Sequence, residues 1–203
     1  MKDKVLLVGL DFETSAGDVD IGAPIQIGIT VGDQNFVSDI GGWKFDDSTK
    51  FRWSEKAAKV HNITQERLNK APDIFEVDIF ATAWLLPLIQ GYQRMNVIAV
   101  GWNVGSFDRQ LVYRNMPNLN KILSYRTLDL NTVCFFTAKV LGDSFEKIKK
   151  QSKQYSEASL TEAAAWHDAL YDAKAGMYQL EYLTNFVKDG VWNMIKQSVP
   201  APV

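Results

Sequence analysis

Residues 5–13 read Val-Leu-Leu-Val-Gly-Leu-Asp-Phe-Glu, an apolar run that ends in two acids. A short uncharged run of this kind is typical of a buried β-strand. Because side chains alternate along a strand, Asp11 and Glu13 point to the same side of it. Acids at the end of a buried strand can converge on hard cations, which prefer oxygen ligands. The spacing alone fits the start of a solvated loop equally well, so the rest of the chain has to decide.

The pattern that follows predicts an α/β fold. Residues 24–31 and 35–40 are rich in strand-forming residues on either side of a turn, and with the first strand they make an antiparallel meander. The apolar run at 97–101 predicts a further buried strand, and residues 125–128 are expected to form another. Helices are expected over residues 54–60, 64–68, 74–89, 107–115, 131–141 and 168–187. We therefore expect a mixed sheet flanked by helices, in a single domain over residues 1–203.

Two local patterns add detail to this outline. In the segment 74–89, Phe75, Ile79, Ala83 and Leu86 fall on one apolar stripe of a helix. Residues 159–162 read Ser-Leu-Thr-Glu, which is the pattern of a capping box at the start of a helix.

The composition is that of an ordinary globular protein. The chain of 203 residues is 46% hydrophobic and 23% charged, with a net charge of −2, so no global basic field indicates nucleic-acid binding. Four acids gathered in one site would, however, mask a local basic rim. Cys134 is the only cysteine, which excludes an internal disulfide framework and fits a reducing compartment. No run is long enough to span a membrane and the first residues lack a signal-peptide pattern, so we expect a cytoplasmic protein.

A third acid, Asp108, follows the predicted strand 97–101. A lone Asp in this position is most simply the favourable acid at a helix N-terminus, stabilised by the helix dipole. Asn103 lies in the connecting turn, and Gly101 before it lets the backbone come close to another group. Phe107 either packs beneath this turn or stacks on a base.

His167 and Asp172 are five residues apart near the start of the last predicted helix. On one continuous helix they would be offset by roughly 140° and would not share a face. They can meet only if the helix begins after His167, with small residues such as Ala169 and Gly176 letting it lie close to the sheet. A single histidine is more often structural or exposed than catalytic, so this pair is not diagnostic by itself.

Together the motifs resemble a known family. Asp11-Phe12-Glu13-Thr14, Asn103-x3-Phe107-Asp108 and His167-x4-Asp172 resemble, in order, the three motifs of the DEDDh 3′–5′ exonuclease superfamily. Residues 61–64 (His-Asn-Ile-Thr) and 24–28 (Pro-Ile-Gln-Ile-Gly) are similar to two further family segments. Asn62 replaces the usual Gly, and Gln26 stands where many members carry Glu. The spacing from Asn103 to Asp108 is similar to that of the exonuclease I class.

The resemblance implies an RNase H-like fold with a mixed five-stranded sheet, and a catalytic centre made of five residues. The implied ligands of two Mg²⁺ or Mn²⁺ ions are Asp11, Glu13, Asp108 and Asp172, with Asp11 bridging both ions. His167 is the implied general base, and the unperturbed pKa of an imidazole, near 6.5, suits that role at neutral pH.

The resemblance also implies a pocket for the terminal nucleotide, formed by Phe12, Thr14, His61, Asn103 and Phe107. Thr14 would approach the 3′-hydroxyl. The bland alternatives are that His61 simply ends a helix and that Asn103 serves its turn. Four lysines lie in a segment that we interpret as a polar loop, where they are either solvated or in contact with phosphates: Lys147, Lys149, Lys150 and Lys153. Trp43, Trp53 and Trp102 either pack in the core or stack on bases.

The leading hypothesis is a metal-dependent 3′–5′ exonuclease acting on single-stranded nucleic acid with a free 3′ end, DNA slightly favoured over RNA. An exoribonuclease and a proofreading subunit that accompanies a polymerase are the alternatives, and a homodimer is equally compatible with the sequence. A module that binds nucleic acid without cutting it is disfavoured, because degenerate copies usually lose an acid and this chain keeps all four and the histidine.

Overall fold

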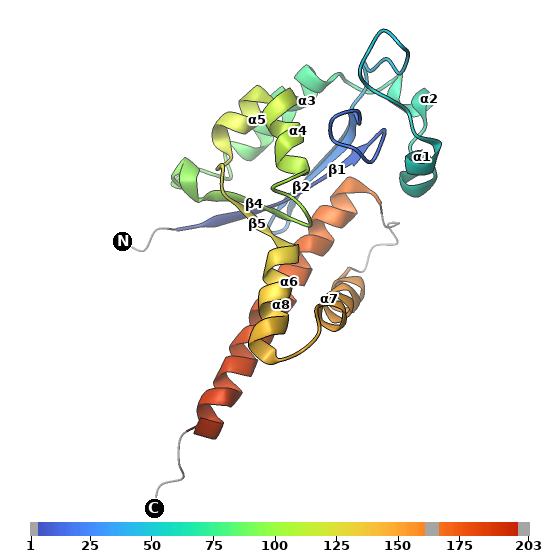
Figure 1. Ribbon diagram of the computed structural model, residues 1–203. Helices are drawn as coiled ribbons and strands as arrows, with labels where there is room; N and C mark the ends of the chain where they lie inside the picture. The colour runs from blue at the N-terminus through green and yellow to red at the C-terminus, as the bar shows by residue number, and fades with distance from the viewer. Residues whose placement is uncertain (1–3, 161–166, 199–203) are drawn as a thin grey trace, which may run out of the picture.

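The computed structural model describes residues 4–160 and 167–198, and its centre is a five-stranded mixed sheet in the order β3-β2-β1-β4-β5 (Figure 1). β1 (Leu6–Thr14), β2 (Pro24–Val31) and β3 (Gln34–Asp39) form the antiparallel meander. β4 (Val97–Gly101) and β5 (Thr127–Asp129) extend it in parallel from the other edge of β1. The mixed five-stranded sheet predicted from the sequence is confirmed.

Helices cover both faces of the sheet (Figure 1). α3 (Ile74–Leu85), α4 (Asp108–Asn115) and α5 (Pro117–Ile122) lie on one face, where they enclose the larger apolar core. The other face holds α6 (Leu130–Leu141), α7 (Phe145–Ser159) and the long α8 (Ala169–Ser198). α1 (Glu55–His61) and α2 (Gln65–Leu68) lie near the carboxyl end of β1, and a 3₁₀ turn, η1 (Arg94–Asn96), leads into β4.

The alternation of side chains along β1 separates core from site. Val8, Leu10 and Phe12 belong to the apolar core shared with α3, α4 and α5. The residues between them face α8, so Asp11 and Glu13 are directed away from that core. β1 is also longer than the apolar run indicates, because it continues to Thr14 and includes both acids.

α8 approaches the sheet at backbone distance. A Cβ atom added to Gly28 would lie 2.2 Å from the carbonyl carbon and oxygen of Ala169, and one added to Gly9 would lie 2.8 Å from the carbonyl oxygen of Ala173. Since Gly28 pairs with Asp11 across β1 and β2, the start of α8 rests beside the first acid. The expected close packing of this helix through small residues is confirmed.

The apolar stripe predicted for the segment 74–89 is wrong. Phe75 and Ile79 are 67% and 56% exposed, and α3 ends at Leu85. The opposite face is buried: Val77 and Ala81 face the core, and Asp78 accepts hydrogen bonds from the first backbone N–H groups of α5. Apolar residues occur on both sides of this helix, so packing against α5 and the sheet, rather than periodicity, selects the buried side.

Two further expectations concern α7. Ser159 is the last residue of that helix and donates to the carbonyl oxygen of Tyr155, whereas Thr161 and Glu162 of the expected capping box lie outside the described residues. The segment interpreted as a polar loop is α7 itself, which therefore carries the four lysines. In the described parts of the chain, no helix combines the length and apolarity needed to cross a membrane.

Candidate active site

The acids of β1 lie in a cavity of about 450 Å³ at the carboxyl end of the sheet. Its walls come from the ends of β1 and β4, from the turn before α4 and from the start of α8. The lining residues are Asp11, Phe12, Glu13, Gly17, Trp102, Asn103, Ser106, Phe107, Asp108, His167 and Asp172. The four acids and the histidine predicted from the sequence thus line one cavity.

Asp108 is tied to β1 by a hydrogen bond. It is the first residue of α4, and its Oδ1 accepts from the backbone N–H of Phe12 at 2.9 Å. Because Phe12 lies between the two acids of β1, this bond fixes the third acid relative to the other two. The helix-start interpretation of Asp108 is correct, and it places the carboxylate in the cavity at the same time.

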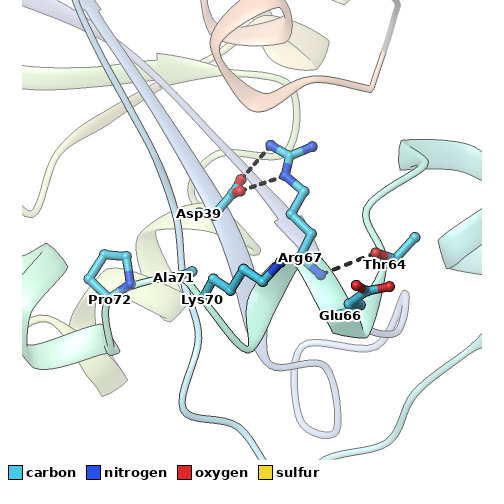
Figure 2. A pocket seen from close by; sticks show the side chains of 7 residues that line it. All are labelled: Asp39, Thr64, Glu66, Arg67, Lys70, Ala71 and Pro72. Carbon is cyan, nitrogen blue, oxygen red and sulfur yellow. Dashed lines mark hydrogen bonds and ion pairs between the residues drawn. The ribbon is translucent and has the colours of Figure 1, made fainter.

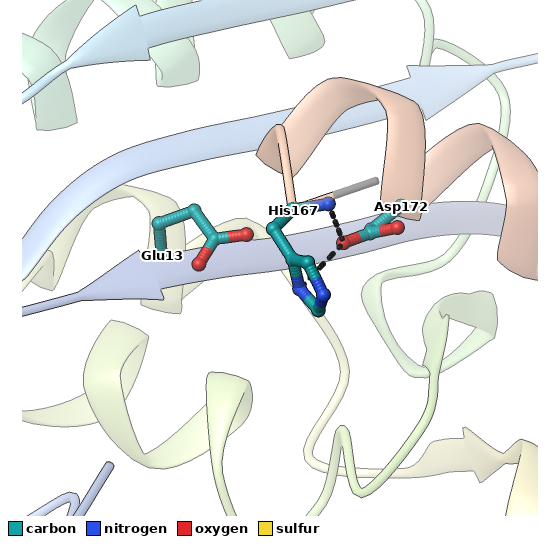
Figure 3. A group of neighbouring side chains, drawn as sticks. All are labelled: Glu13, His167 and Asp172. Carbon is teal, nitrogen blue, oxygen red and sulfur yellow. Dashed lines mark hydrogen bonds and ion pairs between the residues drawn. The ribbon is translucent and has the colours of Figure 1, made fainter. Parts of the chain in front are cut away.

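His167 and Asp172 meet because α8 begins at Ala169, as their spacing requires (Figure 3). His167 has a φ of 70°, and its backbone N–H donates to Oδ2 of Asp172 at 3.0 Å. The imidazole Nδ1 lies 4.0 Å from the same oxygen. Asp168, which the sequence reasoning did not single out, accepts from the backbone N–H groups of Leu170 and Tyr171 and so caps the helix.

The cavity is strongly unfavourable for negative charge. Burial raises the pKa of Asp11 well above its usual value, and Asp108, Asp172 and Glu13 raise it further by repulsion. Burial together with the charges of Asp172, Asp168 and Asp108 raises the pKa of Glu13 to about 8. Each of these carboxylates is held where a charged form is disfavoured unless positive charge compensates it.

Burial also raises the pKa values of the other two acids, Asp108 and Asp172, but neighbouring groups partly oppose the shift. Burial raises the pKa of Asp108 to about 7, although its own backbone N–H and that of Phe12 favour the charged form. Burial also raises the pKa of Asp172 to about 6, against the lowering influence of His167 and Lys153. A divalent cation would supply the missing positive charge for all four groups.

The donor set fits such a cation. Glu13, His167 and Asp172 each offer a ligand atom, and these atoms lie within 4.8 Å of one another (Figure 3). Oδ1 of Asp172 is buried and makes no hydrogen bond within the described part of the chain. A buried carboxylate oxygen without a donor is costly, and a cation bound there would satisfy it. Oxygen donors are those that Mg²⁺ and Mn²⁺ prefer.

The raised pKa values predict how metal binding depends on pH. The metal-free folded protein binds protons that the unfolded chain, with ordinary carboxyl pKa values near 4, has already released. Stability of the metal-free protein therefore falls as pH rises from about 4 to 8. A cation displaces these protons, so we expect millimolar Mg²⁺ or Mn²⁺ to raise the melting temperature several degrees more at pH 8.5 than at pH 6. Thermal denaturation with and without EDTA measures this, and equal stabilisation at both pH values would contradict it.

The residues expected to bind the terminal nucleotide divide into two groups. Phe12, Asn103 and Phe107 line the cavity, and Phe107 also packs against the core. Thr14 and His61 do not line it: the Thr14 hydroxyl donates to the carbonyl oxygen of Ala16 at 2.8 Å, and Nδ1 of the buried His61 accepts from the backbone N–H of Ile63. Their contact with a nucleotide stays a prediction.

Asn103 serves its turn and also lines the cavity, and its contact with a nucleotide stays a prediction. Its φ of 57° makes it the turn residue, and its side-chain oxygen accepts from the side chain of Asn131 at 2.6 Å. Three tryptophans were considered for stacking on bases. Of these, Trp43 donates to the carbonyl oxygen of Pro24 and Trp53 packs on Phe45, so both serve the core. Trp102 lines the cavity.

A second hollow of about 310 Å³ adjoins the first, and the sequence did not indicate that Asn131, Ala175 and Gln179 contribute to its walls. It lies between the end of β4 and helices α6, α7 and α8. Its walls include Lys149 and Lys153, which α7 directs toward the acids, together with Asn131, Ala175 and Gln179. The periodic lysines of α7 were the available signal, because residues four apart share one face of a helix.

A separate hollow of about 640 Å³ lies between β3 and α2 (Figure 2). There Arg67 forms a two-pronged ion pair with Asp39, with Nε–Oδ2 and Nη2–Oδ1 distances of 2.5 and 2.6 Å. Asp39 also accepts from the side-chain amide of Gln26, whose oxygen accepts from the backbone N–H of Ala169. A polar chain thus runs from this surface hollow to the start of α8.

Comparison with solved structures shows the same fold in nucleases. The zinc-bound complex of Escherichia coli exonuclease I with single-stranded DNA superposes with a TM-score of 0.58 and 17% identity, over 94% of this chain and 43% of that one. Cell-death related nuclease 4 gives 0.59 and 17%, over 89% and 64%. A 3′-exonuclease that recognises the histone mRNA stem-loop gives 0.60 and 11%, over 91% and 84%. The chain spans less than half the length of exonuclease I.

None of the curated proteins compared matches the sequence. The sequence does match a family model, that of the RNase T-type exonucleases, over residues 8–180. This range contains β1, the turn before α4 and the start of α8, which bring the four acids and the histidine into one cavity. The chain therefore belongs to the exonuclease family.

Proposed function

We propose that this protein is a 3′–5′ exonuclease that removes nucleotides one at a time from single-stranded nucleic acid, with DNA as the preferred strand. The observation that carries the proposal is the convergence of Asp11, Glu13, Asp108, Asp172 and His167 in one cavity. The fold shared with exonuclease I bound to DNA oligonucleotides supports a strand of this kind.

Each of these five residues has a proposed part in the reaction. The four acids would hold two divalent cations, Mg²⁺ or Mn²⁺, with Asp11 placed to serve both. Bound there, the cations stabilise the attacking and leaving oxygens of an in-line displacement. His167 takes a proton from the attacking water, whose oxygen bonds to the phosphorus. The bond from phosphorus to the O3′ of the preceding nucleotide breaks, and the leaving oxygen takes a proton from solvent water, so that a nucleoside 5′-monophosphate is released and a new 3′-hydroxyl remains.

The position of His167 suits this role. Its side chain is 53% exposed, and its Nδ1 lies 4.0 Å from Asp172, so the imidazole can reach both solvent and the acids. Glu13 and Asp172 border the same space as the imidazole, which supports the proposal that His167 accepts the proton.

The test is a cleavage assay on matched 5′-labelled DNA and RNA oligonucleotides, single- and double-stranded, with Mg²⁺, with Mn²⁺ and with EDTA. We expect a ladder that shortens from the 3′ end of single-stranded DNA and disappears with EDTA. A ladder on RNA alone would replace DNA by RNA as the substrate. Release of one internal fragment, or no cleavage under any condition, would refute an exonuclease.

A further inference from the structure

The cavity of the acids and the second hollow form one continuous trough with two arms. Both are lined by Asp11, Trp102, Asn103, His167 and Asp172, so the arms meet at the carboxylates. We name them the acidic arm, toward Phe12, Glu13, Gly17, Ser106, Phe107 and Asp108, and the lysine arm, toward Asn131, Lys149, Lys153 and Gln179.

The two arms differ in charge. Among the described residues that line the acidic arm, Glu13 and Asp108 are acids and none is a lysine or arginine. The lysine arm has two, Lys149 and Lys153, four residues apart on α7 and therefore on one face of the helix. Both lysines line one hollow with Asp11 and Asp172, so this face of α7 is directed toward the acids.

The wall of the lysine arm is held in place by specific contacts between side chains. The ammonium group of Lys149 lies 4.9 Å from the ring centroid of Trp102 and 5.7 Å from that of Phe145. The indole N–H of Trp102 donates to the side-chain oxygen of Gln179, whose amide donates to the hydroxyl of Ser156 at 3.1 Å. Gln179 is only 3% exposed, so α7, α8 and the end of β4 are fixed together around the aromatic surface that holds Lys149.

The chemistry of a 3′ end indicates which part of the substrate each arm would bind. The terminal nucleotide has a free 3′-hydroxyl and no phosphate beyond the scissile one. The strand on the other side carries one further phosphate for every nucleotide. A cation-free pocket therefore suits the terminal nucleotide, and a cationic one suits the continuing strand.

We propose, resting on the function proposed above, that the strand 5′ of the scissile phosphate leaves the site through the lysine arm. Lys149 and Lys153 bind its phosphates there, and Trp102 positions Lys149. These lysines are specificity residues for chain length, because only a substrate with phosphates beyond the one being cut offers phosphates for them to bind.

The test compares two double variants on two substrates of the sugar class that the wild type cuts. Lys149→Ala/Lys153→Ala removes the proposed phosphate-binding groups. Lys147→Ala/Lys150→Ala removes the same charge from the same helix, at positions that line neither arm. The substrates are a dodecanucleotide and a dinucleoside monophosphate, whose only phosphate is the scissile one.

For Lys149→Ala/Lys153→Ala we expect KM for the dodecanucleotide to rise about tenfold or more with kcat within about twofold, and the dinucleoside monophosphate to be cut within about twofold of the wild-type rate. The salt dependence of oligonucleotide binding, measured in the Asp11→Asn background, should weaken by about 0.7 in log–log slope for each phosphate that a lysine no longer neutralises. Equal effects of the two double variants, or equal losses on the two substrates, would overturn the proposal. A wild type that cuts neither substrate would instead refute the proposed function.

Discussion

Replacement of Asp11 by Asn is expected to lower exonuclease activity by about 10³-fold or more, because the carboxylate placed to serve both cations is removed. Stabilisation by bound metal accounts for several kcal/mol of such a barrier, and each 1.36 kcal/mol is a factor of ten in rate. Single-turnover cleavage of a 5′-labelled oligonucleotide measures this directly. The substitution is nearly isosteric, so the strand and its neighbours keep their packing.

The same variant should be more stable than the wild type when metal is absent. Burial and repulsion from Asp108, Asp172 and Glu13 raise the pKa of Asp11, so a neutral amide relieves them. At pH 8 we expect a gain of about 1 kcal/mol or more, which is roughly 2–4 °C in melting temperature for a chain of this size. The gain should shrink as pH falls and vanish only below about pH 4, where the carboxyl of Asp11 is protonated in the unfolded chain as well. Asp47→Asn, at an exposed acid, is the matched control and should change neither property.

Replacement of His167 by Asn is expected to lower kcat by about 10²- to 10⁴-fold, the range typical of a missing general base, with little change in KM. Asn is chosen because it tolerates the positive φ of 70° at this position, which preserves the backbone bond to Asp172. Metal-induced stabilisation should persist, since the four acids remain.

Added imidazole gives an independent measurement of this role. In His167→Gly, which also tolerates the backbone conformation, imidazole in solution should restore part of the turnover. A merely structural histidine predicts no rescue. Loss of oligonucleotide binding in the Asn variant, with an unchanged single-turnover rate at saturation, would contradict the general-base role.

Short-range rules account for the direction of individual acids, whereas the expectation that all four share one site came from the resemblance to the exonuclease superfamily. Period-two alternation directs Asp11 and Glu13 to one side of β1, and the five-residue spacing of His167 and Asp172 requires a helix that starts between them. Both rules hold in the structure. The strand itself runs further than its apolar residues, because pairing with β2 continues to Thr14.

The lysine arm could not be predicted in the same way. The polar composition of residues 145–159 favours a loop, whereas Ser144 caps a helix there through the backbone N–H of Lys147. Only the docking of α7 on α8 brings Lys149 toward the site. Contacts of this kind join segments far apart in sequence, and no local pattern encodes them.

Gln26 illustrates a departure from the family pattern that the structure explains. Its amide oxygen accepts from Ala169 and its amide nitrogen donates to Asp39. A glutamate could accept from Ala169 but could not donate to a neighbouring carboxylate. It would also bring another negative charge close to the start of α8. Asp39, on the next strand, therefore accounts for the amide at this position.

The contact of Gly28 with Ala169 limits how closely α8 can approach the sheet beside the active centre. Because backbone meets backbone there, the depth at which α8 seats on the sheet is set by main-chain atoms and is independent of side-chain rotamers. The gap between the acid of α8 and those of β1 is thereby fixed before any cation binds. A glutamate at position 172 would be longer by one methylene, and α8 could not move away from the sheet to make room for it. The contact with Gly28 and the hydrogen bond between Ala169 and Gln26 hold the start of the helix in place. The distance between Asp172 and the acids of β1 is therefore set by the backbone, at a contact where Gly28 has no side chain.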